Sequence, residues 1–387
     1  MDVCIVGGGI AGLTLAYWLS EKGDNVTVLE KSSSLRTEGY MIDFFGPGYE
    51  VAEKMGLMNE LRNIHYPIDS LVFMKNDGEK KYDIPYPKLR KLMDDKHFNF
   101  MRGDLESVLY KQVKNRVNVK FDSSPVSIDQ DDDHVYVTLT DESTLTSDLL
   151  VGADGMRSSV RSLAFNETFN NSIRYIGYYT AAYIIDDPAV LSKTGRSFYT
   201  YSEPGAQVSV YPIRGNKVAT FFLYTYPEQQ GHVTQERAFH QLHEQFGHMN
   251  WIVPDLLKAS VDADDFYFDE VSQVELPEWR NGRITFVGDS CQCVSLLAGQ
   301  GASMAMAGAY TLAKSLENQT DLSTALAHYE QSLHSDIEAL QRSARKFANY
   351  FLPDSWWRIY VRDVLTRASV LPGIRKFVNF KTVRLPQ

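Results

Sequence analysis

The stretch VCIVGGGIAG, residues 3–12, decides the fold of this chain. Its first four residues are apolar, which is typical of a strand buried on both faces of a parallel sheet. Gly7, Gly9 and Gly12 follow with the spacing G-x-G-x-x-G, and residues 11–20 have the composition of a helix. A strand, a glycine-rich turn and a helix in this order predict a dinucleotide-binding unit.

Each glycine has a separate physical role in such a unit. Gly7 permits the tight turn, Gly9 lets a pyrophosphate approach the backbone, and Gly12 packs the helix on the strand. The start of the helix adds amide donors and a partial positive charge. A second strand is expected over residues 25–30, and it ends in Glu30, which is placed to accept hydrogen bonds from a ribose. The sequence therefore predicts a Rossmann-type site.

The composition limits the number of domains and the class of partner. A chain of 387 residues exceeds one typical core, so we expect two domains. The formal net charge is −10, but residues 341–387 carry +8 and the rest of the chain carries −18. Nucleic-acid binding requires a basic face, so a body this acidic argues against nucleic acid as the main partner.

The cysteines and the apolar runs indicate the compartment. Cys4, Cys291 and Cys293 are too few for a disulfide framework in a chain of this length. The first residues lack the basic and apolar regions of a signal peptide, and no apolar run reaches about 18 residues. We therefore expect a cytoplasmic protein without stable membrane association, and a monomer.

Two later strands are expected to bring further motifs to the same sheet edge. Residues 149–152 are followed by a turn containing Asp154 and Gly155, and residues 283–287 lead to Gly288 and Asp289. The carboxyl ends of the strands are where open α/β sheets bind ligands. A freely exchanging nicotinamide would call for a second domain with its own catalytic acid–base residue, whereas these strand-end motifs follow instead, so the bound dinucleotide is predicted to be FAD.

A helix is expected over residues 105–113, and Asp104 is expected as its N-cap. Arg102 comes just before this helix, where its side chain could reach phosphate or ribityl oxygens of the cofactor. Arg102 is therefore a further candidate for flavin binding.

The motifs together resemble those of the class A flavoprotein monooxygenases of the para-hydroxybenzoate hydroxylase type. Asp154-Gly155-x-x-Ser158-x-x-Arg161 matches the family's D-G motif, and Gly288-Asp289 with Gly299-Gln300-Gly301 matches its G-D motif. Arg36-x-x-Gly39-x-x-x-Asp43 and the segment MRGDL, residues 101–105, look most like the tetracycline-inactivating branch, the tetracycline destructases. The motifs span residues 1–310.

The resemblance implies a reaction that rests on the cofactor. NADPH would reduce FAD, and O2 would form a flavin C4a-hydroperoxide that hydroxylates an aromatic or polyketide-like small molecule, with tetracyclines among the expected substrates. No catalytic side chain and no metal ligand is predicted. By the resemblance, Asp43, Arg102 and Asp289 hold FAD and Arg36 meets NADPH. The predicted cofactor-binding residues are Gly7, Gly9, Gly12, Glu30, Lys31, Arg36, Asp43, Arg102, Asp154, Gly155, Gly288, Asp289, Gly299, Gln300 and Gly301.

The loop of residues 288–303, GDSCQCVSLLAGQGAS, departs from the family pattern G-D-A-x-H-P-x-x-P-x-x-G-Q-G-x-N. Gln292 stands in place of the histidine, and Cys293 and Leu296 replace the prolines. No histidine lies at ligand spacing to Cys291 and Cys293, so small semi-buried loop residues are favoured over a metal site. A thiol pair beside the flavin, or a covalent link to the flavin, is the alternative. These departures leave two other functions open: a flavin-dependent reductase or dehydrogenase, and a non-catalytic flavin-binding protein.

The predicted fold class is α/β, with a single Rossmann-type FAD-binding domain, an inserted antiparallel-sheet substrate domain and a C-terminal helix. The FAD-binding domain is expected over residues 1–73, 97–173 and 270–340, the substrate domain over 74–96 and 174–269, and the helical segment over 341–387.

The middle of the chain is expected to form the substrate sheet. Alternating residues predict antiparallel strands at 176–185, 197–201, 207–213 and 217–226. Alternation does not say which face points inward. The candidates to line the substrate pocket are Tyr199, Tyr201, Tyr211, Phe221 and Tyr224.

The segment from Ser355 to Arg367 has helical periodicity, with aromatic residues on one side and basic residues on the other. Three interpretations compete. The helix caps the substrate pocket, as the resemblance suggests, or it lies in a membrane interface, for which Trp, Tyr and Arg are suited. In the third interpretation it docks on the acidic body through complementary charge.

Overall fold

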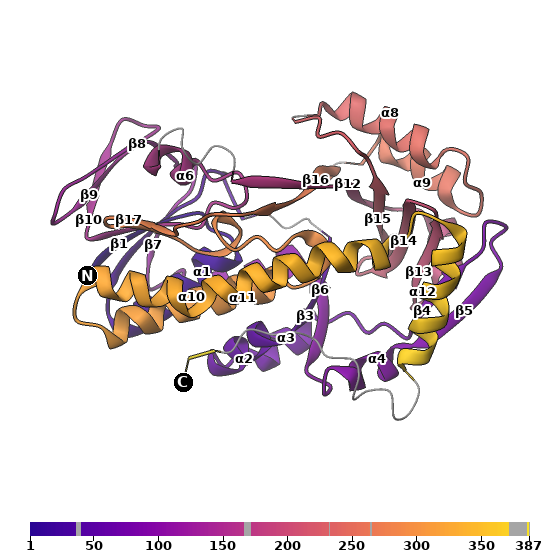
Figure 1. Ribbon diagram of the computed structural model, residues 1–387, viewed down its shortest axis with the longest axis horizontal. Helices are drawn as coiled ribbons and strands as arrows, with labels where there is room; N and C mark the ends of the chain where they lie inside the picture. Colours follow the sequence, from indigo (N-terminus) through magenta and orange to yellow (C-terminus); the bar gives the residue numbers. More distant parts are fainter. Residues whose placement is uncertain (36–39, 166–171, 232, 264, 371–384, 387) are drawn as a thin grey trace.

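A computed structural model of the chain describes residues 1–35, 40–165, 172–231, 233–263, 265–370 and 385–386. Two sheets lie toward opposite ends of an elongated molecule, and the helices α10 (Gly301–Asn318) and α11 (Leu322–Phe351) run between them (Figure 1). The predicted α/β class with a parallel nucleotide-binding sheet, an antiparallel sheet and C-terminal helices is confirmed.

The six-stranded sheet has the order β17-β18-β11-β1-β2-β7, and its strands are parallel except for β17 at one edge. Strand β1 (Asp2–Val6) is central and is buried from its second residue onward, as its apolar run predicts. Helix α1 (Ile10–Lys22) follows it. The other strands are β2 (Asn25–Leu29), β7 (Asn118–Lys120), β11 (Leu149–Gly152), β17 (Arg280–Asn281) and β18 (Ile284–Phe286).

Smaller elements complete this half of the molecule. One antiparallel sheet contains β8 (Pro125–Gln130), β9 (Val135–Leu139) and β10 (Thr144–Ser147), and a two-stranded sheet contains β3 (Met41–Phe45) and β6 (His97–Met101). The helices are α2 (Pro47–Lys54), α3 (Met58–Ile64), α5 (Arg102–Val113) and α6 (Ser159–Ala164), with short 3-10 turns at Gly288–Ser290 and Leu296–Ala298. Helix α5 begins at Arg102 with Met101 as its N-cap, so the prediction that Asp104 caps it is wrong. The side chain of Asp104 instead pairs with Arg214 at 3.2 Å.

The second large sheet has the order β16-β12-β15-β14-β13-β4-β5. All its neighbouring strands are antiparallel except β13 and β4. It takes in residues 70–74 and 267–274, so the sheet extends a few residues beyond the predicted substrate domain. The strands are β4 (Ser70–Met74), β5 (Lys80–Pro85), β12 (Ile173–Ile185), β13 (Phe198–Glu203), β14 (Ala206–Ile213), β15 (Lys217–Thr225) and β16 (Tyr267–Val274). Helix α7 (Pro188–Thr194) connects β12 to β13, and helix α4 (Tyr86–Leu92) leads from β5 back to β6 of the nucleotide half.

Helices α8 (Gln235–Phe246) and α9 (Val253–Ser260) cover one face of this sheet (Figure 1). Tyr201 and Tyr224 belong to the apolar cluster beneath these helices, and Tyr199 packs against it. These three candidates therefore face away from the nucleotide half. Tyr211 and Phe221 lie on the opposite face, which we call the inner face, where they contact residues of the nucleotide half.

Helix α12 (Trp356–Ser369) packs against β13 and the neighbouring edge of the sheet (Figure 1). Asp363 accepts hydrogen bonds from Lys81 Nζ at 2.6 Å and from Tyr82 Oη at 3.0 Å, and Arg362 donates to Ser202 Oγ at 3.3 Å. In the Lys81–Asp363 pair, the helix supplies the acidic residue and the body supplies the basic one. Docking of a basic helix on an acidic body would have placed these charges the other way round. Trp357, on the other side of the helix, is 70% exposed.

No helix among the described residues is long and apolar enough to cross a membrane.

Replacement of Asp363 by alanine should loosen helix α12. The substitution removes the carboxylate that pairs with the buried guanidinium of Arg362. Breaking such a buried ion pair costs about 3 kcal/mol. Urea unfolding should show this loss, and limited proteolysis should cut the C-terminal region faster. Asp354→Ala is the matched control, because Asp354 forms an exposed pair with Arg358 one turn away and should change stability by less than about 0.5 kcal/mol. Equal effects of the two substitutions would contradict this account of the docking.

Candidate functional site

Gly7, in the turn between β1 and α1, and Gly12, in the first turn of α1, have no room for a side chain. Gly7 adopts φ +113°, and a Cβ atom there would lie 2.4 Å from the carbonyl oxygen of Ala153. A Cβ atom on Gly12 would lie 2.0 Å from the carbonyl oxygen of Gly7. Two of the three predicted glycines therefore allow backbone segments to touch. Gly12 allows the helix to touch the turn at Gly7, and Gly7 allows the turn to touch the loop after β11.

The start of α1 is open to an anion. Gly9 is the N-cap, no side chain caps the helix, and its first turn contains no acid. A Cβ atom on Gly9 would lie 3.7 Å from Glu106 Oε1 and 3.8 Å from Arg102 Nη2, so this glycine has space around it within the protein. Arg102 thus brings a guanidinium beside the helix N-terminus, in an ion pair with Glu106 at 3.1 Å. Free amides, the helix dipole and a cation together favour a phosphate group.

Glu30 lies at the end of β2, next to the glycine turn. Its Oε2 accepts from the backbone N–H of Gly8 at 2.8 Å, and its Oε1 accepts from the N–H of Ser32 at 2.9 Å. These bonds orient the carboxylate, and each oxygen keeps a lone pair for a hydroxyl donor. Lys31 is exposed beside it, and Arg36 lies outside the described residues.

Asp43 is held by three residues that the sequence did not single out. Its Oδ1 accepts from Tyr86 Oη at 3.1 Å, His97 Nε2 at 3.0 Å and Asn99 Nδ2 at 2.6 Å. Its side chain is 51% exposed, so the carboxylate remains accessible. Desolvation by the protein acts to raise the pKa of Asp43. The hydrogen bond and charge of His97, together with the hydrogen bonds from Tyr86 and Asn99, outweigh it and lower the pKa below its ordinary 3.8. The pairing of Asp43 with Asn99 across β3 and β6 creates this cluster.

Gly288 and Asp289 pack against the first turn of α1. Gly288 adopts φ +69°, and a Cβ atom there would lie 2.6 Å from Cβ of Ala11. Asp289 remains exposed, yet desolvation by the surrounding protein raises its pKa above the ordinary 3.8, and the nearby charge of Arg102 opposes that rise. Asp289 and Arg102, which are far apart in the sequence, therefore act on one another at this edge.

Hydrogen bonds tie the loop after β11 to the loop after β18. Arg161 donates to the carbonyl of Ser290 at 2.7 Å and to that of Met156 at 2.6 Å, and Ser290 Oγ donates to the carbonyl of Gly152 at 2.7 Å. The carboxylate of Asp154 accepts from Ser158 Oγ at 2.5 Å and from the N–H of Ser159 at 2.7 Å. Asp154 thereby holds the start of α6 in place. Gly155, with φ +84°, follows it in the turn.

The other end of the 288–303 loop leads into α10. Gly299 adopts φ +63°, and Gln300 is the N-cap of a helix that begins at Gly301 without a side-chain cap or an acid in its first turn. Oε1 of Gln300 is buried and has no hydrogen-bond partner among the described residues. An acceptor without a partner and free amides at a helix start fit the polar edge of a bound ring system.

Gln292, at the position of the family's histidine, points into the core. It is 1% exposed, its Nε2 donates to Tyr329 Oη at 2.6 Å, and Tyr329 donates to the carbonyl of Phe286 at 2.9 Å. A Cβ atom on Gly308 would lie 2.2 Å from Gln292 Oε1, so a side chain at this position of α10 would displace the Gln292 amide. Gln292 therefore connects the loop to α10 and α11.

Cys291 and Cys293 are buried in the same loop. Desolvation raises the pKa of both thiols well above the ordinary 9.0, so both stay protonated and are poor nucleophiles. Their burial agrees with the interpretation as packing residues. Among the residues that the structure describes, no group of three or more His, Cys, Asp or Glu side chains is arranged to hold a metal ion.

This arrangement fits FAD. The glycine turn and Arg102 would take the pyrophosphate, Glu30 the adenosine ribose, and the cluster around Asp43 and the helix start at Gly301 would take the flavin end. A dinucleotide-binding unit that faces an antiparallel sheet indicates that the protein is a flavoprotein.

Comparison with known proteins supports this class. Residues 1–343 match the family described as "FAD binding domain", so the chain belongs to the FAD-binding domain family. It is 30% identical over 390 residues to a protein named "Flavin-dependent monooxygenase" from an unknown prokaryotic organism, covering 100% of this chain and 98% of that protein. It is 28% identical to "FAD-dependent monooxygenase asL4" of Sarocladium schorii, covering 96% and 93%. The crystal structure of tetracycline destructase Tet(55) superposes with a TM-score of 0.87 at 28% identity, covering 100% and 98%. The protein is an FAD-dependent monooxygenase.

Replacement of Gly9 by alanine should weaken FAD binding without unfolding the protein. The added methyl group meets protein atoms only at ordinary contact distances, but it enters the space that the pyrophosphate needs. We expect the dissociation constant for FAD to rise at least about tenfold, which is about 1.4 kcal/mol, measured by fluorescence titration of the apoprotein.

Gly23→Ala is the matched control for that substitution. Gly23 caps the other end of α1 at φ +94° with no atom near its Cβ position, so it should cost about 1 kcal/mol of stability and leave FAD affinity unchanged. If Gly9→Ala binds FAD as tightly as Gly23→Ala, the close approach at Gly9 does not occur.

The lowered pKa of Asp43 predicts a pH dependence of stability. A carboxylate whose pKa is lowered by folding stabilises the protein above its unfolded pKa of about 3.8 and loses that contribution as pH falls through its folded pKa. Asp43→Asn should therefore lower the free energy of unfolding relative to the unsubstituted protein at pH 6, and the difference should shrink below about pH 4. Urea unfolding from pH 3 to pH 7 measures this. A difference that grows toward acid pH would contradict the hydrogen-bonded carboxylate.

Proposed function

We propose that this flavin-dependent monooxygenase hydroxylates an electron-rich aromatic or polyketide-like molecule, with NADPH as the electron donor. The observation that carries the proposal is the inner face of the seven-stranded sheet, which sets aromatic side chains opposite the nucleotide half. When bound, FAD supplies the electron transfer and oxygen activation that no side chain provides.

The inner face suits a planar ring. Tyr211 stacks on Phe198 with ring centroids 5.0 Å apart and an interplanar angle of 9°, and its Oη accepts from the N–H of Met41 at 2.8 Å. Phe221 lies in an apolar cluster with Leu296 of the loop that would face the flavin. Flat apolar walls with a few fixed polar groups are typical of sites that bury aromatic ligands.

Polar groups at the side of this face could orient a substrate oxygen. Asp269 on β16 accepts two bonds from Arg157, at 2.9 and 2.6 Å, and the ring of Tyr267 lies 5.8 Å from that of Tyr40. Desolvation raises the pKa of Tyr267 well above its ordinary 10.0, so it is a neutral phenol that donates a hydrogen bond. We assign these residues to orienting the substrate and excluding water, and we assign no general base.

Two further observations support the choice of donor and substrate. The chain has one dinucleotide motif, which FAD takes, so NADPH would bind transiently without a domain of its own. The likeness to tetracycline destructase Tet(55) makes tetracyclines a reasonable first substrate class. The core position of Gln292 means that the lost histidine does not by itself favour a reductase over a hydroxylase.

Turnover of the purified yellow protein tests the proposal. NADPH oxidation and O2 uptake should rise when aromatic compounds, including tetracyclines, are added, and mass spectrometry should find a product heavier by one oxygen atom. NADH in place of NADPH tests the donor. NADPH oxidation with a reduced product and no oxygenated product would instead indicate a reductase, and bound FAD that never turns over would indicate a non-catalytic protein.

A further inference from the structure

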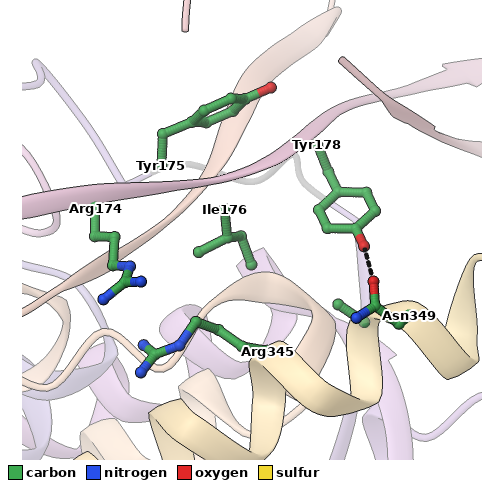
Figure 2. A pocket seen from close by; sticks show the side chains of 7 residues that line it. Arg174, Tyr175, Ile176, Tyr178, Arg345 and Asn349 are labelled. Carbon is green, nitrogen blue, oxygen red and sulfur yellow. Dashed lines mark hydrogen bonds between the residues drawn. The ribbon is translucent and has the colours of Figure 1, made fainter. Parts of the chain in front are cut away.

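A cavity of about 270 Å³ lies between the start of β12 and the C-terminal end of α11 (Figure 2). It is built from residues that the cofactor site does not use. The residues that line it are Arg174, Tyr175, Ile176, Tyr178, Arg345, Ala348 and Asn349.

The cavity wall carries more positive than negative charge. Arg174 Nη1 lies 3.3 Å from both carboxylate oxygens of Glu275, and Arg345 Nη1 lies 2.8 Å from Oε1 of the same residue. Two guanidinium groups therefore share one carboxylate, and each keeps further N–H donors. Figure 2 shows both groups on the same side of the cavity. This pair leaves one positive charge that an anion could neutralise.

The rest of the cavity is apolar with one further donor. Oδ1 of Asn349 accepts from Tyr178 Oη at 3.3 Å, which leaves the Asn349 amide N–H groups as donors (Figure 2). Ile176 and Ala348 contribute alkyl surface: Ala348 belongs to the apolar cluster that contains Tyr178, and Ile176 packs against that cluster. A charged end and an apolar end lie within one small space.

We propose that this cavity is a binding site for a small amphipathic carboxylate, separate from the flavin site. Its carboxylate would take bonds from Arg174 and Arg345, for which the planar guanidinium is well matched, and its alkyl or aryl part would lie on Ile176 and Ala348. A volume of about 270 Å³ lies just below the usual range of small-molecule sites, so the ligand is small.

A hydrogen-bond chain connects this cavity to the 288–303 loop. Arg345 donates to Oε1 of the fully buried Gln273, and Gln273 Nε2 donates to the carbonyl of Val294 at 3.0 Å. Gln341, one turn earlier on α11, donates to the carbonyl of Cys293 at 3.0 Å. A carboxylate that draws Arg345 away from Gln273 therefore changes the support of the loop beside the flavin. Through this chain we expect ligand binding in the cavity to alter the flavin environment and, because coupling between two sites is reciprocal, FAD binding to alter the affinity of the cavity.

Calorimetric titration of the FAD-loaded protein with hexanoate at low ionic strength tests the site. Hexanoate carries an alkyl chain and no aromatic ring, and hexanamide is its uncharged counterpart. We expect saturable binding of one equivalent of hexanoate, and at least tenfold weaker binding of hexanamide. Arg174→Gln should weaken hexanoate binding at least tenfold, and thermal unfolding checks that this exposed substitution leaves the fold intact.

Arg342→Gln is the matched control, because Arg342 lies on the same helix as Arg345, is 57% exposed and pairs with Glu338 outside the cavity. It should bind hexanoate as the unsubstituted protein does. The proposed site would be overturned if Arg174→Gln bound hexanoate as tightly as the unsubstituted protein, or if hexanamide bound as tightly as hexanoate.

The flavin absorbance spectrum tests the coupling separately. Hexanoate should change the spectrum of the unsubstituted protein with the same midpoint as the calorimetric titration, and Arg174→Gln should shift both midpoints together. Binding by calorimetry without any spectral change would overturn the connection to the loop. None of these measurements depends on turnover, so they are independent of the proposed substrate.

Discussion

The structure depends on the contact of backbone with backbone at the carboxyl edge of the parallel sheet. Gly7 lies against the carbonyl of Ala153 at a distance that excludes a Cβ atom, and Gly288 lies similarly close to the Cβ atom of Ala11 at the start of α1. Glycine is required because other residues would separate the loops or would be strained at positive φ. With the loops in contact, amides at the start of α1, Asp289 and Arg102 can act on one ligand.

Helices α10 and α11 carry that arrangement over to the second sheet. Ser303, in the first turn of α10, accepts from the N–H of Gly48 at 2.7 Å and donates to the carbonyl of Phe45, which fixes β3 and α2 against it. On the other side, Gln273 of β16 bonds the 288–303 loop and the carbonyl of Gln341 on α11. The loop that would face the flavin is thus supported by hydrogen bonds from both halves of the molecule. Cys293 and Leu296, which stand in place of the family's prolines, lie in this hydrogen-bonded part of the loop.

Much of the nucleotide half could be predicted from local pattern. The glycine spacing, the buried strand before it and the acid after the second strand are short-range features whose geometry leaves few alternatives. Other predictions failed or stayed open for want of long-range information. Met101, not Asp104, caps α5, because Asp104 instead pairs with Arg214 from the other half. His97 and Asn99 support Asp43 only because β6 pairs with β3 across more than fifty residues of chain.

The sequence alone determined the class of protein: one dinucleotide motif, three strand-end motifs in order and an inserted antiparallel sheet. Tertiary structure decided what individual side chains do. It turned Tyr199, Tyr201 and Tyr224 toward α8 and α9, and Tyr211 and Phe221 toward the nucleotide half, because a strand has two equivalent faces until another layer covers one of them. It buried Gln292 and brought Arg174 and Arg345 to one cavity, because those contacts join segments that the chain itself keeps far apart.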